Sequence, residues 1–368
     1  METLLYQTAR RLPVPPLVLA PRPAHAQDLT VRSIATTPRG RPGRGLYRVG
    51  WALHPSLHYT AAFWRGAVDA ARTYRPDVLQ AGHVYLAPLA WLLARRLRTP
   101  FVVYAFGQEV WRHGRAMGVA PVDGFLRGGA LARADAVLAL GDFTASLLLD
   151  WAVPPERVVR VPFGAQPRPP AAPPTGATLL SVGRLVPRKG VDTVIRAIPA
   201  LALMFPGLAY RVVGGGPDES RLRRLAAALG VGERVTFLGR LGQQELDREF
   251  RRCALFVQPS RRTADGELEG LGLVYFEAAA WGRPAVAGRS GGEGDAVVDG
   301  VTGVLVDGGS VEAVTAAIAA LLRDPARLSA YGAAARRRVE AGYTWDHAAA
   351  VVDGVLVRVR RQAAAGPC

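Results

Sequence analysis

The sequence predicts an α/β protein of two doubly wound, Rossmann-like domains that face each other across a cleft. Three observations predict this fold: strand-like and helix-like segments alternate over short loops in the first half, six prolines interrupt them at residues 162–177 (PFGAQPRPPAAPPTGA), and the alternation then resumes. Proline-rich segments without periodicity are typical of stiff linkers. We therefore expect domains at residues 1–165 and 178–343, a linker at 166–177, and a C-terminal helix and tail at 344–368 that can cross back to the first domain.

The elements of the first domain follow from hydrophobic periodicity. Helices carry apolar residues three and four positions apart, as in WLLARRL, whereas strands are short runs rich in Val, Leu and Ala. The expected helices lie at residues 57–74, 84–97, 125–133 and 143–151. The expected strands lie at residues 78–80, 101–105, 136–140 and 158–161. This alternation predicts a parallel sheet covered on both faces.

The N-terminal segment has two interpretations. A secretory signal can be assembled from two arginines, an apolar stretch at residues 12–20 and a small-x-small site at residues 24–26, but prolines interrupt the stretch and the arginines lie ten residues from the start. We favour the alternative, in which residues 1–12 (METLLYQTARRL) form an amphipathic helix that precedes a strand at residues 17–20.

The second domain repeats the alternation. The expected strands lie at residues 178–182, 210–213, 235–238, 255–258, 284–287 and 303–306. The expected helices, including the terminal one, lie at residues 191–204, 220–229, 243–251, 271–281, 311–322, 326–341 and 345–361. Ligands of open parallel sheets bind outside the carboxyl ends of the strands, so the cleft between the two domains is the expected binding site.

Composition limits the possible functions. The 368 residues include 46 Lys and Arg against 30 Asp and Glu, a formal net charge of +16, and only Lys189 among the 46 is a lysine. Positive charge suits phosphates of nucleotides, nucleic acids or lipid headgroups. However, a preference for arginine over lysine along the whole chain indicates the base composition of the coding sequence rather than a function of each arginine. The 49% hydrophobic fraction argues against disorder, and no apolar run reaches the roughly 18–20 residues of a membrane span.

Neither the cysteines nor the histidines indicate a metal site. Cys253, in an expected helix, and Cys368 lack the spacing of metal ligands or of a disulfide framework, which fits a cytosolic protein. The histidines also lack ligand spacing, so we expect neither a metal nor a cofactor.

The segment SVGRLVPRKG, at residues 181–190, is the first candidate for chemistry. It follows an expected strand and leads into a helix, and Gly183 permits a tight turn between them. Arg184 and Lys189, five residues apart, suit two neighbouring phosphates because a guanidinium fork and a compact ammonium bind phosphate oxygens well. The alternative is an ordinary solvated charge pair, and the position beside the cleft favours the phosphate site.

The segment EGLGLVYFE, at residues 269–277, is the second candidate. Gly270 and Gly272 lie at the start of an expected helix, where free backbone N–H groups and the helix dipole favour an anion. Glu269 and Glu277 are separated by at most about 12 Å of helix axis, so their carboxylates can accept hydrogen bonds from hydroxyls on both sides of a bound diphosphate. The alternative is a glycine-rich helix start with an exposed Glu at each end.

In order along the chain, RLVPRKG, VVGGGPDESRLRRLA, VTFLGRL and EGLGLVYFEAAAWGRPAVAGRSGG carry a family resemblance. The stretch from residue 178 to about 343 resembles the retaining family 4 glycosyltransferases of the GT-B fold. Within that family, its motif sequences are most similar to those of the bacterial phosphatidylinositol mannosyltransferases, which use GDP-mannose.

The resemblance implies roles for individual residues. Arg184 and Lys189 would hold the donor diphosphate and Glu269 the transferred sugar, which makes these three the expected catalytic residues. Glu277 would hold the donor ribose. The other implied donor-binding residues are Gly183, Gly215, Arg240, Leu241, Gly270, Leu271, Gly272 and Leu273, with Arg240-Leu241 along the base.

The first half departs from the family pattern at its start. Family members begin with a strand, a Gly-Gly loop and a helix, and METLLYQTARRLP resembles the first residues of that helix. We therefore expect that Met1 is an internal codon and that the first N-terminal strand is missing from this sequence. The first strand is central in this topology, so a protein without it would have unpaired backbone groups in its sheet. An upstream reading frame without a strand ending in Gly-Gly would contradict this.

A second departure lies in AFGQE, at residues 105–109. The family usually has His-Gly-x-Glu or His-Gly-x-Asp here, with the His near the transferred sugar, and Phe106 occupies the His position. We expect Phe106, Gly107 and Glu109 to form an acceptor or sugar loop in which the role of that imidazole is absent or fulfilled differently. His113 would replace it only in an unusual loop conformation.

The expected reaction moves a hexosyl group from a GDP- or UDP-hexose, with mannose from GDP-mannose favoured, to a lipid or glycan hydroxyl of the cell envelope with retention. The resemblance implies a front-face route, in which the leaving phosphate helps to deprotonate the acceptor. The expected location is cytoplasmic, in contact with an anionic membrane surface at its inner face. Basic residues suited to that contact, or else merely solvated, are Arg39, Arg41, Arg44, Arg95, Arg96 and Arg98.

Three alternatives remain. A nucleic-acid-binding protein would account for the net charge, but the chain lacks an RNP motif, zinc-finger spacing and aromatics between its arginine clusters. Another GT-B enzyme, such as a sugar-nucleotide epimerase or a phosphorylase, is possible, although a phosphorylase needs a cofactor lysine and the only lysine lies in the phosphate loop. The chain could also be an inactive product of a short reading frame.

Overall fold

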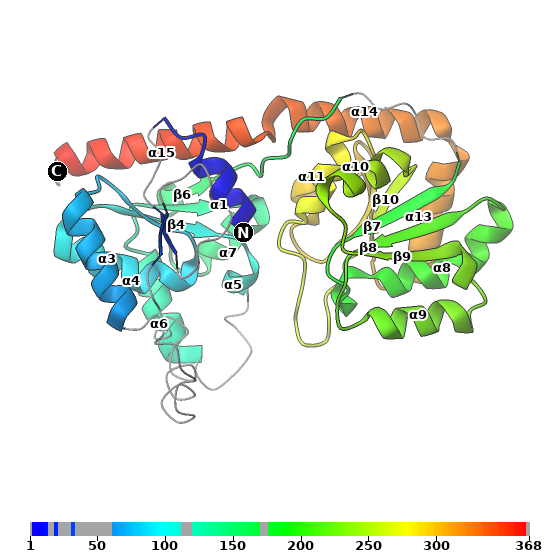
Figure 1. The fold of residues 1–368 in the computed structure, drawn as a ribbon, viewed down its shortest axis with the longest axis horizontal. Helices are drawn as coiled ribbons and strands as arrows, with labels where there is room; N and C mark the ends of the chain where they lie inside the picture. The colour runs from blue at the N-terminus through cyan, green and yellow to red at the C-terminus, as the bar shows by residue number, and fades with distance from the viewer. Residues whose placement is uncertain are drawn as a thin grey trace. The chain divides into compact units, whose positions relative to one another are not determined.

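The chain folds into two compact units, drawn in Figure 1. Unit 1 combines Met1–Pro162 with Trp345–Cys368, and unit 2 comprises Phe163–Thr344. The last helix therefore belongs to the same unit as the first half of the chain. The structure is a computed structural model, and it describes residues 2–13, 18–20, 31–33, 61–111, 120–169 and 176–365.

Some sequence features lie outside the described residues. They are the small-x-small site at residues 24–26, the basic loop at residues 39–44, His113, and residues 170–175 of the proline-rich segment.

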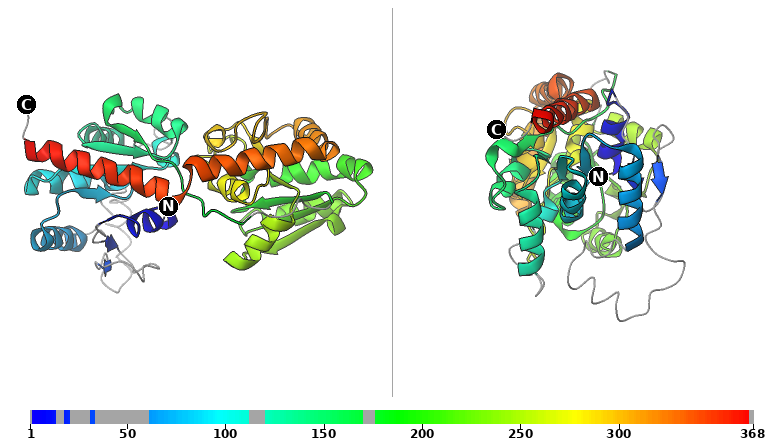
Figure 2. Two further views of the ribbon diagram at one scale, coloured as in Figure 1. Left: turned by 90° about the horizontal axis from the view of Figure 1, so that it is seen from above. Right: turned by 90° about the vertical axis from the view of Figure 1, so that its left-hand side faces the viewer.

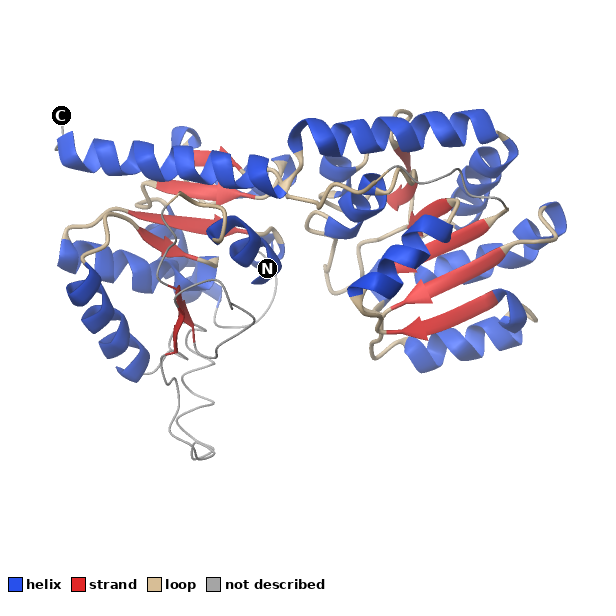
Figure 3. Cartoon of the chain, turned by 45° about the horizontal axis from the view of Figure 1, so that its top comes forward, coloured by secondary structure: helices blue, strands red, loops and turns tan. Residues whose placement is uncertain are grey.

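Unit 2 is a parallel sheet with helices on both faces, as Figure 3 shows. Its described strands pair in the order β12-β11-β10-β7-β8-β9. Their bounds are β7 Thr178–Val182, β8 Ala209–Val213, β9 Val235–Gly239, β10 Leu255–Gln258, β11 Ala285–Gly288 and β12 Gly303–Val306. Successive strands β8 and β9 extend the sheet on one side of β7, whereas β10, β11 and β12 extend it on the other. The strand order therefore reverses between β7 and β10, where ligands of doubly wound sheets bind.

The helices of unit 2 connect these strands. Their bounds are α8 Val191–Met204, α9 Glu219–Ala228, α10 Gln243–Arg252, α11 Leu273–Ala280, α12 Glu293–Ala296, α13 Val311–Arg323 and α14 Pro325–Gly342. The core between helices and sheet is aliphatic and aromatic, and it includes Leu179, Ile195, Ile198, Tyr210, Val257 and Ile318.

Unit 1 contains a second parallel sheet, with the described strands in the order β3-β4-β5-β6. Their bounds are β3 Leu79–Ala81, β4 Phe101–Ala105, β5 Ala136–Ala139 and β6 Val158–Arg160. A separate parallel pair consists of β1 Val18–Ala20 and β2 Val31–Ser33. The helices are α1 Glu2–Ala9, α3 Ala61–Tyr74, α4 Ala87–Leu97, α5 Gln108–Trp111, α6 Ala120–Leu131, α7 Asp142–Leu149 and α15 Trp345–Ala365.

The C-terminal helix α15 packs on the N-terminal part of unit 1. It contacts α1 and β5, and Figure 2 shows it running along this unit. Arg11 Nε lies 2.8 Å from Asp346 Oδ1 at the start of α15. The inner face of the helix is apolar, with Trp345, Ala348, Val352, Val355 and Val359 buried.

The fold confirms the predicted class of two parallel-sheet α/β domains, and the long elements lie within a few residues of their predicted bounds. The predicted helix at residues 84–97 is divided, because Val84–Leu86 form a 3-10 turn before α4. The short elements β2, α5 and α12 were not predicted, since three or four residues show no periodicity. The prediction for Cys253 was wrong: this buried residue follows the last residue of α10 in extended backbone.

Candidate active site

The loop after β7 carries the first predicted site and lies on the glycine loop after β8. Gly183 has a φ of 153°, and its N–H donates to the Val213 carbonyl at 2.9 Å. A Cβ at Gly214 would lie 1.9 Å from the Gly183 oxygen, and one at Gly216 would lie 2.2 Å from the Leu185 oxygen. Glycine is therefore required at these two positions for close backbone approach. Gly215, the predicted donor-binding glycine between them, has room for a side chain, since its nearest neighbour is 3.9 Å away.

Lys189 points to Glu269 across the strand reversal. It ends the 3-10 helix Pro187–Lys189, just before α8. Its Nζ donates to Glu269 Oε2 at 2.5 Å, and Arg188 Nη1 donates to the same oxygen at 3.1 Å. The Lys189 and Glu269 side chains are only 12% and 9% exposed, so this is a buried cluster of two cations and one carboxylate. The sequence alternative of two exposed glutamates at the ends of EGLGLVYFE was wrong for Glu269.

The cations keep Glu269 ionised. Burial alone raises the pKa of the carboxyl, but the charges of Lys189 and Arg188 and hydrogen bonds from Lys189 and Ser260 hold the pKa below its ordinary value. Ser260 Oγ donates to Glu269 Oε2 at 3.4 Å from the loop after β10. Two cations thus surround the Glu269 carboxylate beside the carboxyl ends of β7 and β10, and Arg188 Nε also lies 4.0 Å from Glu267 Oε2.

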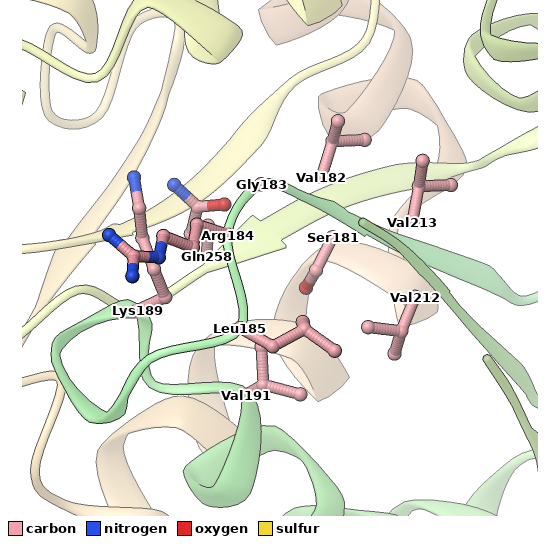
Figure 4. A pocket seen from close by; sticks show the side chains of 10 residues that line it. All are labelled: Ser181, Val182, Gly183, Arg184, Leu185, Lys189, Val191, Val212, Val213 and Gln258. Carbon is pink, nitrogen blue, oxygen red and sulfur yellow. The ribbon is translucent and has the colours of Figure 1, made fainter. Parts of the chain in front are cut away.

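Arg184 and Lys189 are among the residues that surround one small space beside the loop after β7. Figure 4 shows their side chains together with that of Gln258, on the same side of the loop after β7. The Gln258 amide nitrogen donates to the Val182 carbonyl at 2.7 Å, and its oxygen accepts from Lys189 Nζ at 3.2 Å. Arg184 is exposed, whereas Lys189 is held by Gln258 and Glu269. An exposed guanidinium next to an ammonium that is held by hydrogen bonds is suited to neighbouring phosphate oxygens.

The second predicted segment forms the start of α11. Gly272, the residue before the helix, has a φ of 74°, and a Cβ there would lie 2.3 Å from the Tyr275 ring. Gly270 and Leu271 are buried next to it, and Leu273 is the first helical residue, half-buried. The glycines thus bring the backbone at the start of α11 close to Glu269.

Glu277 lies in different surroundings from Glu269. Its side chain keeps an exposed surface on α11, yet the protein atoms around it desolvate the carboxyl and raise its pKa to about 7. Arg168 opposes this rise and Asp247 adds to it. These two residues pair with each other at 2.9 Å, and Arg168 also lies over the Trp281 ring, 5.4 Å from its centre.

Arg240 and Leu241 are farther along the same edge of the sheet. They follow β9, the edge strand, two strands away from β7. Arg240 is exposed and Leu241 is half-buried. The structure thus places them at the carboxyl edge, but not within the Lys189–Glu269 cluster.

The sequence interpretation missed four residues of this site. Arg188 was overlooked because it adjoins Lys189 and only the spacing of Arg184 and Lys189 was considered. Gln258 and Ser260 end and follow a buried strand, and a polar pair at the carboxyl end of a strand was the available signal. The fourth is Glu293, a fully buried carboxyl in α12.

The predicted acceptor loop lies at the carboxyl end of β4 in unit 1. Glu109 is buried, and its carboxylate accepts from the Phe106 N–H at 2.5 Å across Gly107, whose φ is 107°. Burial raises the pKa of Glu109, while backbone hydrogen bonds and the charge of Arg127 oppose the rise. Glu109 therefore holds its own loop in shape.

His83, which the sequence interpretation set aside, lies beside Phe106. It follows the neighbouring strand β3, and the centres of the two rings are 6.1 Å apart. His83 Nδ1 accepts from the Tyr85 N–H at 3.2 Å. Burial, with a smaller effect of Arg127, lowers the pKa of His83 to about 4. The ring is therefore neutral at physiological pH, with its proton on Nε2, where it can donate to a hydroxyl.

Within the described ranges, no group of three or more His, Cys, Asp and Glu side chains is arranged to hold a metal ion.

Two family models match the chain. Residues 163–338 match "Glycosyl transferases group 1", and residues 5–164 match "Glycosyl transferase 4-like domain". The two matches adjoin and together extend over most of the chain, which confirms the resemblance found in the motifs.

Curated relatives match about half of the chain. A GDP-mannose-dependent alpha-(1-6)-phosphatidylinositol monomannoside mannosyltransferase of Mycolicibacterium smegmatis is 45% identical over 168 residues, which are 45% of this chain and 44% of that protein. A D-inositol 3-phosphate glycosyltransferase of Rhodococcus opacus is 40% identical over 49% of this chain and 40% of its own length. The matched stretch thus spans less than half of either relative.

Solved structures share the fold over nearly the whole chain. Anabaena Alr3699/HepE in complex with UDP superposes with a TM-score of 0.78 at 18% identity, covering 97% of this chain and 96% of its own. Sucrose-phosphate synthase from Thermosynechococcus elongatus gives 0.71 at 22% identity, covering 92% and 84%. At these identities the likeness establishes the fold.

Proposed function

Because the chain belongs to the glycosyltransferases of the GT-B fold, we propose that it moves a hexosyl group from a nucleotide-diphosphate sugar to a hydroxyl of a lipid or glycan acceptor, with retention of anomeric configuration. The observation that carries this proposal is the buried cluster of Lys189, Arg188 and Glu269 at the reversal of strand order in unit 2. A diphosphate leaving group needs fixed positive charge, and its sugar needs a hydrogen-bond acceptor. The cluster offers both.

The transition state would be stabilised by charge that is already in place. As the bond from the sugar to the diphosphate breaks, negative charge grows on the phosphate oxygens, and Lys189, Arg184 and the N–H groups at the start of α11 are positioned to receive it. Glu269 stays ionised and accepts hydrogen bonds from sugar hydroxyls. On the front-face route, the leaving phosphate takes the proton of the acceptor hydroxyl.

The favoured donor is GDP-mannose, with other GDP- and UDP-hexoses as competitors. The name of the Mycolicibacterium relative specifies GDP-mannose, whereas Anabaena Alr3699/HepE was solved with UDP. We assign Glu277 to the donor ribose and Arg240-Leu241 to the base, since these residues follow Glu269 and β9 at the same edge of the sheet.

We assign the acceptor to unit 1. The relatives named above act on phosphatidylinositol monomannoside and on D-inositol 3-phosphate, so a polyol or a glycolipid headgroup is the acceptor class we propose. Phe106, Gly107 and Glu109 form the loop at the carboxyl end of β4, and His83 adds a neutral donor beside it.

Contact with an anionic membrane at its inner face is part of the proposal. Arg95, Arg96 and Arg98 are exposed at the C-terminal end of α4, where each can add about 1 kcal/mol of attraction to anionic lipid. In the part of the chain that the structure describes, no helix has the length and apolar character of a membrane span.

The first test is donor turnover by the purified chain with a panel of GDP- and UDP-hexoses. We expect Lys189→Ala to lower turnover at least about 100-fold, because it removes a fixed charge from the leaving group. Arg196→Ala is the matched control: Arg196 is an exposed basic residue of α8, the helix that follows Lys189, and its loss should leave turnover unchanged. Turnover of the Lys189 variant equal to that of the control would refute the proposal.

A further inference from the structure

Glu293 is a fully buried carboxyl that the assignments above leave without a role. It begins the short helix α12, in the loop after β11. Its Oε1 accepts from Ser290 Oγ at 2.5 Å, and its Oε2 accepts from the backbone N–H groups of Gly291 and Ser290 at 2.7 and 3.2 Å. Both carboxylate oxygens are thus engaged by the turn at residues 290–291.

The same turn forms hydrogen bonds with both the N–H and the carbonyl of Glu269. The Glu269 N–H donates to Ser290 Oγ at 3.3 Å, and the Glu269 carbonyl accepts from the Gly292 N–H at 2.9 Å. The two backbones are in close contact, because a Cβ at Gly292 would lie 1.9 Å from the Gly270 oxygen. The position of Glu269 is therefore fixed by the turn, and the turn by Glu293.

We propose that Glu293 is a positioning residue, which sets the place of Glu269 through the turn of Ser290, Gly291 and Gly292. This inference rests on the proposed function, in which Glu269 contacts the transferred sugar. Glu293 does not touch the donor itself. Its contribution is to satisfy three donors at once, which a carboxylate can do and an amide cannot, because an amide nitrogen would face an N–H or O–H donor.

Glu293→Gln is accordingly the informative variant, since it preserves size and reverses the polarity of one contact. Burial, opposed by the hydrogen bonds from Ser290 and Gly291, raises the pKa of Glu293 to about 7. Assays at pH 8 therefore compare the amide with the ionised carboxylate. Glu249→Gln is the matched control, because Glu249 is also buried in unit 2 but pairs with Arg211, away from the turn.

The kinetic test separates positioning from general damage. We expect Glu293→Gln to lower the kcat for donor turnover by about 30-fold, because small displacements of reacting groups are costly. The Kd of the nucleoside diphosphate, which has no sugar for Glu269 to hold, should change less than about threefold. Ser290→Ala should give part of the same kcat loss, and Glu249→Gln should leave kcat within about twofold of wild type.

Amide hydrogen exchange tests the inference without turnover. In Glu293→Gln, and to a smaller extent in Ser290→Ala, the amide of Glu269 should exchange about tenfold faster than in wild type, and Glu249→Gln should not change it. If wild type turns over no donor but exchange changes as expected, the proposed function fails and the positioning role stands. Unchanged Glu269 exchange in both turn variants overturns the inference, as does an unchanged kcat in an active enzyme. If Glu293→Gln fails to fold, the Ser290 variant decides.

Discussion

At the scale of single residues, the candidate site is built from charged side chains that lie far apart in the sequence and pair in the structure. Lys189 and Glu269 are 80 positions apart, and the structure joins them by a direct ion pair. The spacing of residues could not reveal that Arg188 donates to the same carboxylate oxygen, because the direction of a side chain on a 3-10 turn depends on how the turn packs. Nor could spacing find Glu293, whose partners are backbone groups of a turn without periodicity.

Glu277 provides a prediction about pH. If it accepts hydrogen bonds from the donor ribose, its ionised form accepts them much more strongly than its protonated form, and its pKa of about 7 means that the ionised form predominates only above that pH. The affinity for GDP or UDP should therefore rise about tenfold between pH 6 and pH 8, relative to that of Glu277→Gln. Isothermal titration calorimetry at several pH values measures both proteins.

The comparison with the glutamine variant removes the titration of the nucleotide phosphate, which both proteins experience. A nucleotide without ribose hydroxyls is a second control, because it should bind wild type and variant with the same pH dependence. Parallel curves for wild type and Glu277→Gln with the ordinary nucleotide would separate Glu277 from the ribose.

At the scale of elements, the sequence predicted long helices and strands well, but it did not predict short segments whose shape depends on contacts with a neighbouring loop. Helices and strands with a full period of apolar residues lie close to their predicted bounds, as for α8 and β10. The turn of Ser290, Gly291 and Gly292 and the following helix α12 have no such period. Their shape depends on a neighbouring loop, since a Cβ at Gly292 would meet the Gly270 oxygen.

This contact gives a prediction for two neighbouring glycines, Gly292 in the turn and Gly294 in α12. Gly292→Ala should lower the free energy of unfolding by about 2 kcal/mol and reduce turnover, because the new Cβ pushes the Glu269 loop away. Gly294→Ala, with no atom within 4 Å of its Cβ, should change stability by less than about 1 kcal/mol. Chemical denaturation and donor turnover measure both effects, and equal stability of the two variants would contradict the close approach.

At the scale of the whole molecule, many of the arginines have structural roles. Within the described residues, many arginines hold the protein together: Arg261 pairs with Asp192, Arg211 with Glu249, and Arg338 lies over the Tyr343 ring. The abundance of arginine is therefore not by itself evidence for a polyanionic partner. The sequence predicted two domains from the proline-rich interruption and a last helix that can cross back to the first domain, and the long-range contacts place that helix in unit 1.

The return of the chain to unit 1 predicts a local response to a distant substitution. Val352→Asp places a charge on the buried face of α15 and should destabilise unit 1 by about 3 kcal/mol. Hydrogen exchange should quicken in β4 and β5 but not in β7 and β10. Arg358→Asp, on the exposed face of the same helix, is the control. Equal loss of protection in both units would show that α15 stabilises more than unit 1.

The single lysine also gives the chain one cleavage site for a protease that is specific for lysine. An enzyme that cleaves only after lysine can cut one bond, Lys189–Gly190, and would release fragments 1–189 and 190–368. That bond lies at the end of a 3-10 helix whose lysine is 12% exposed and bound to Glu269, so cleavage requires the loop to open. The rate at which two fragments of nearly equal length form therefore reports the opening of the proposed donor loop, and a ligand that holds the loop closed would slow it.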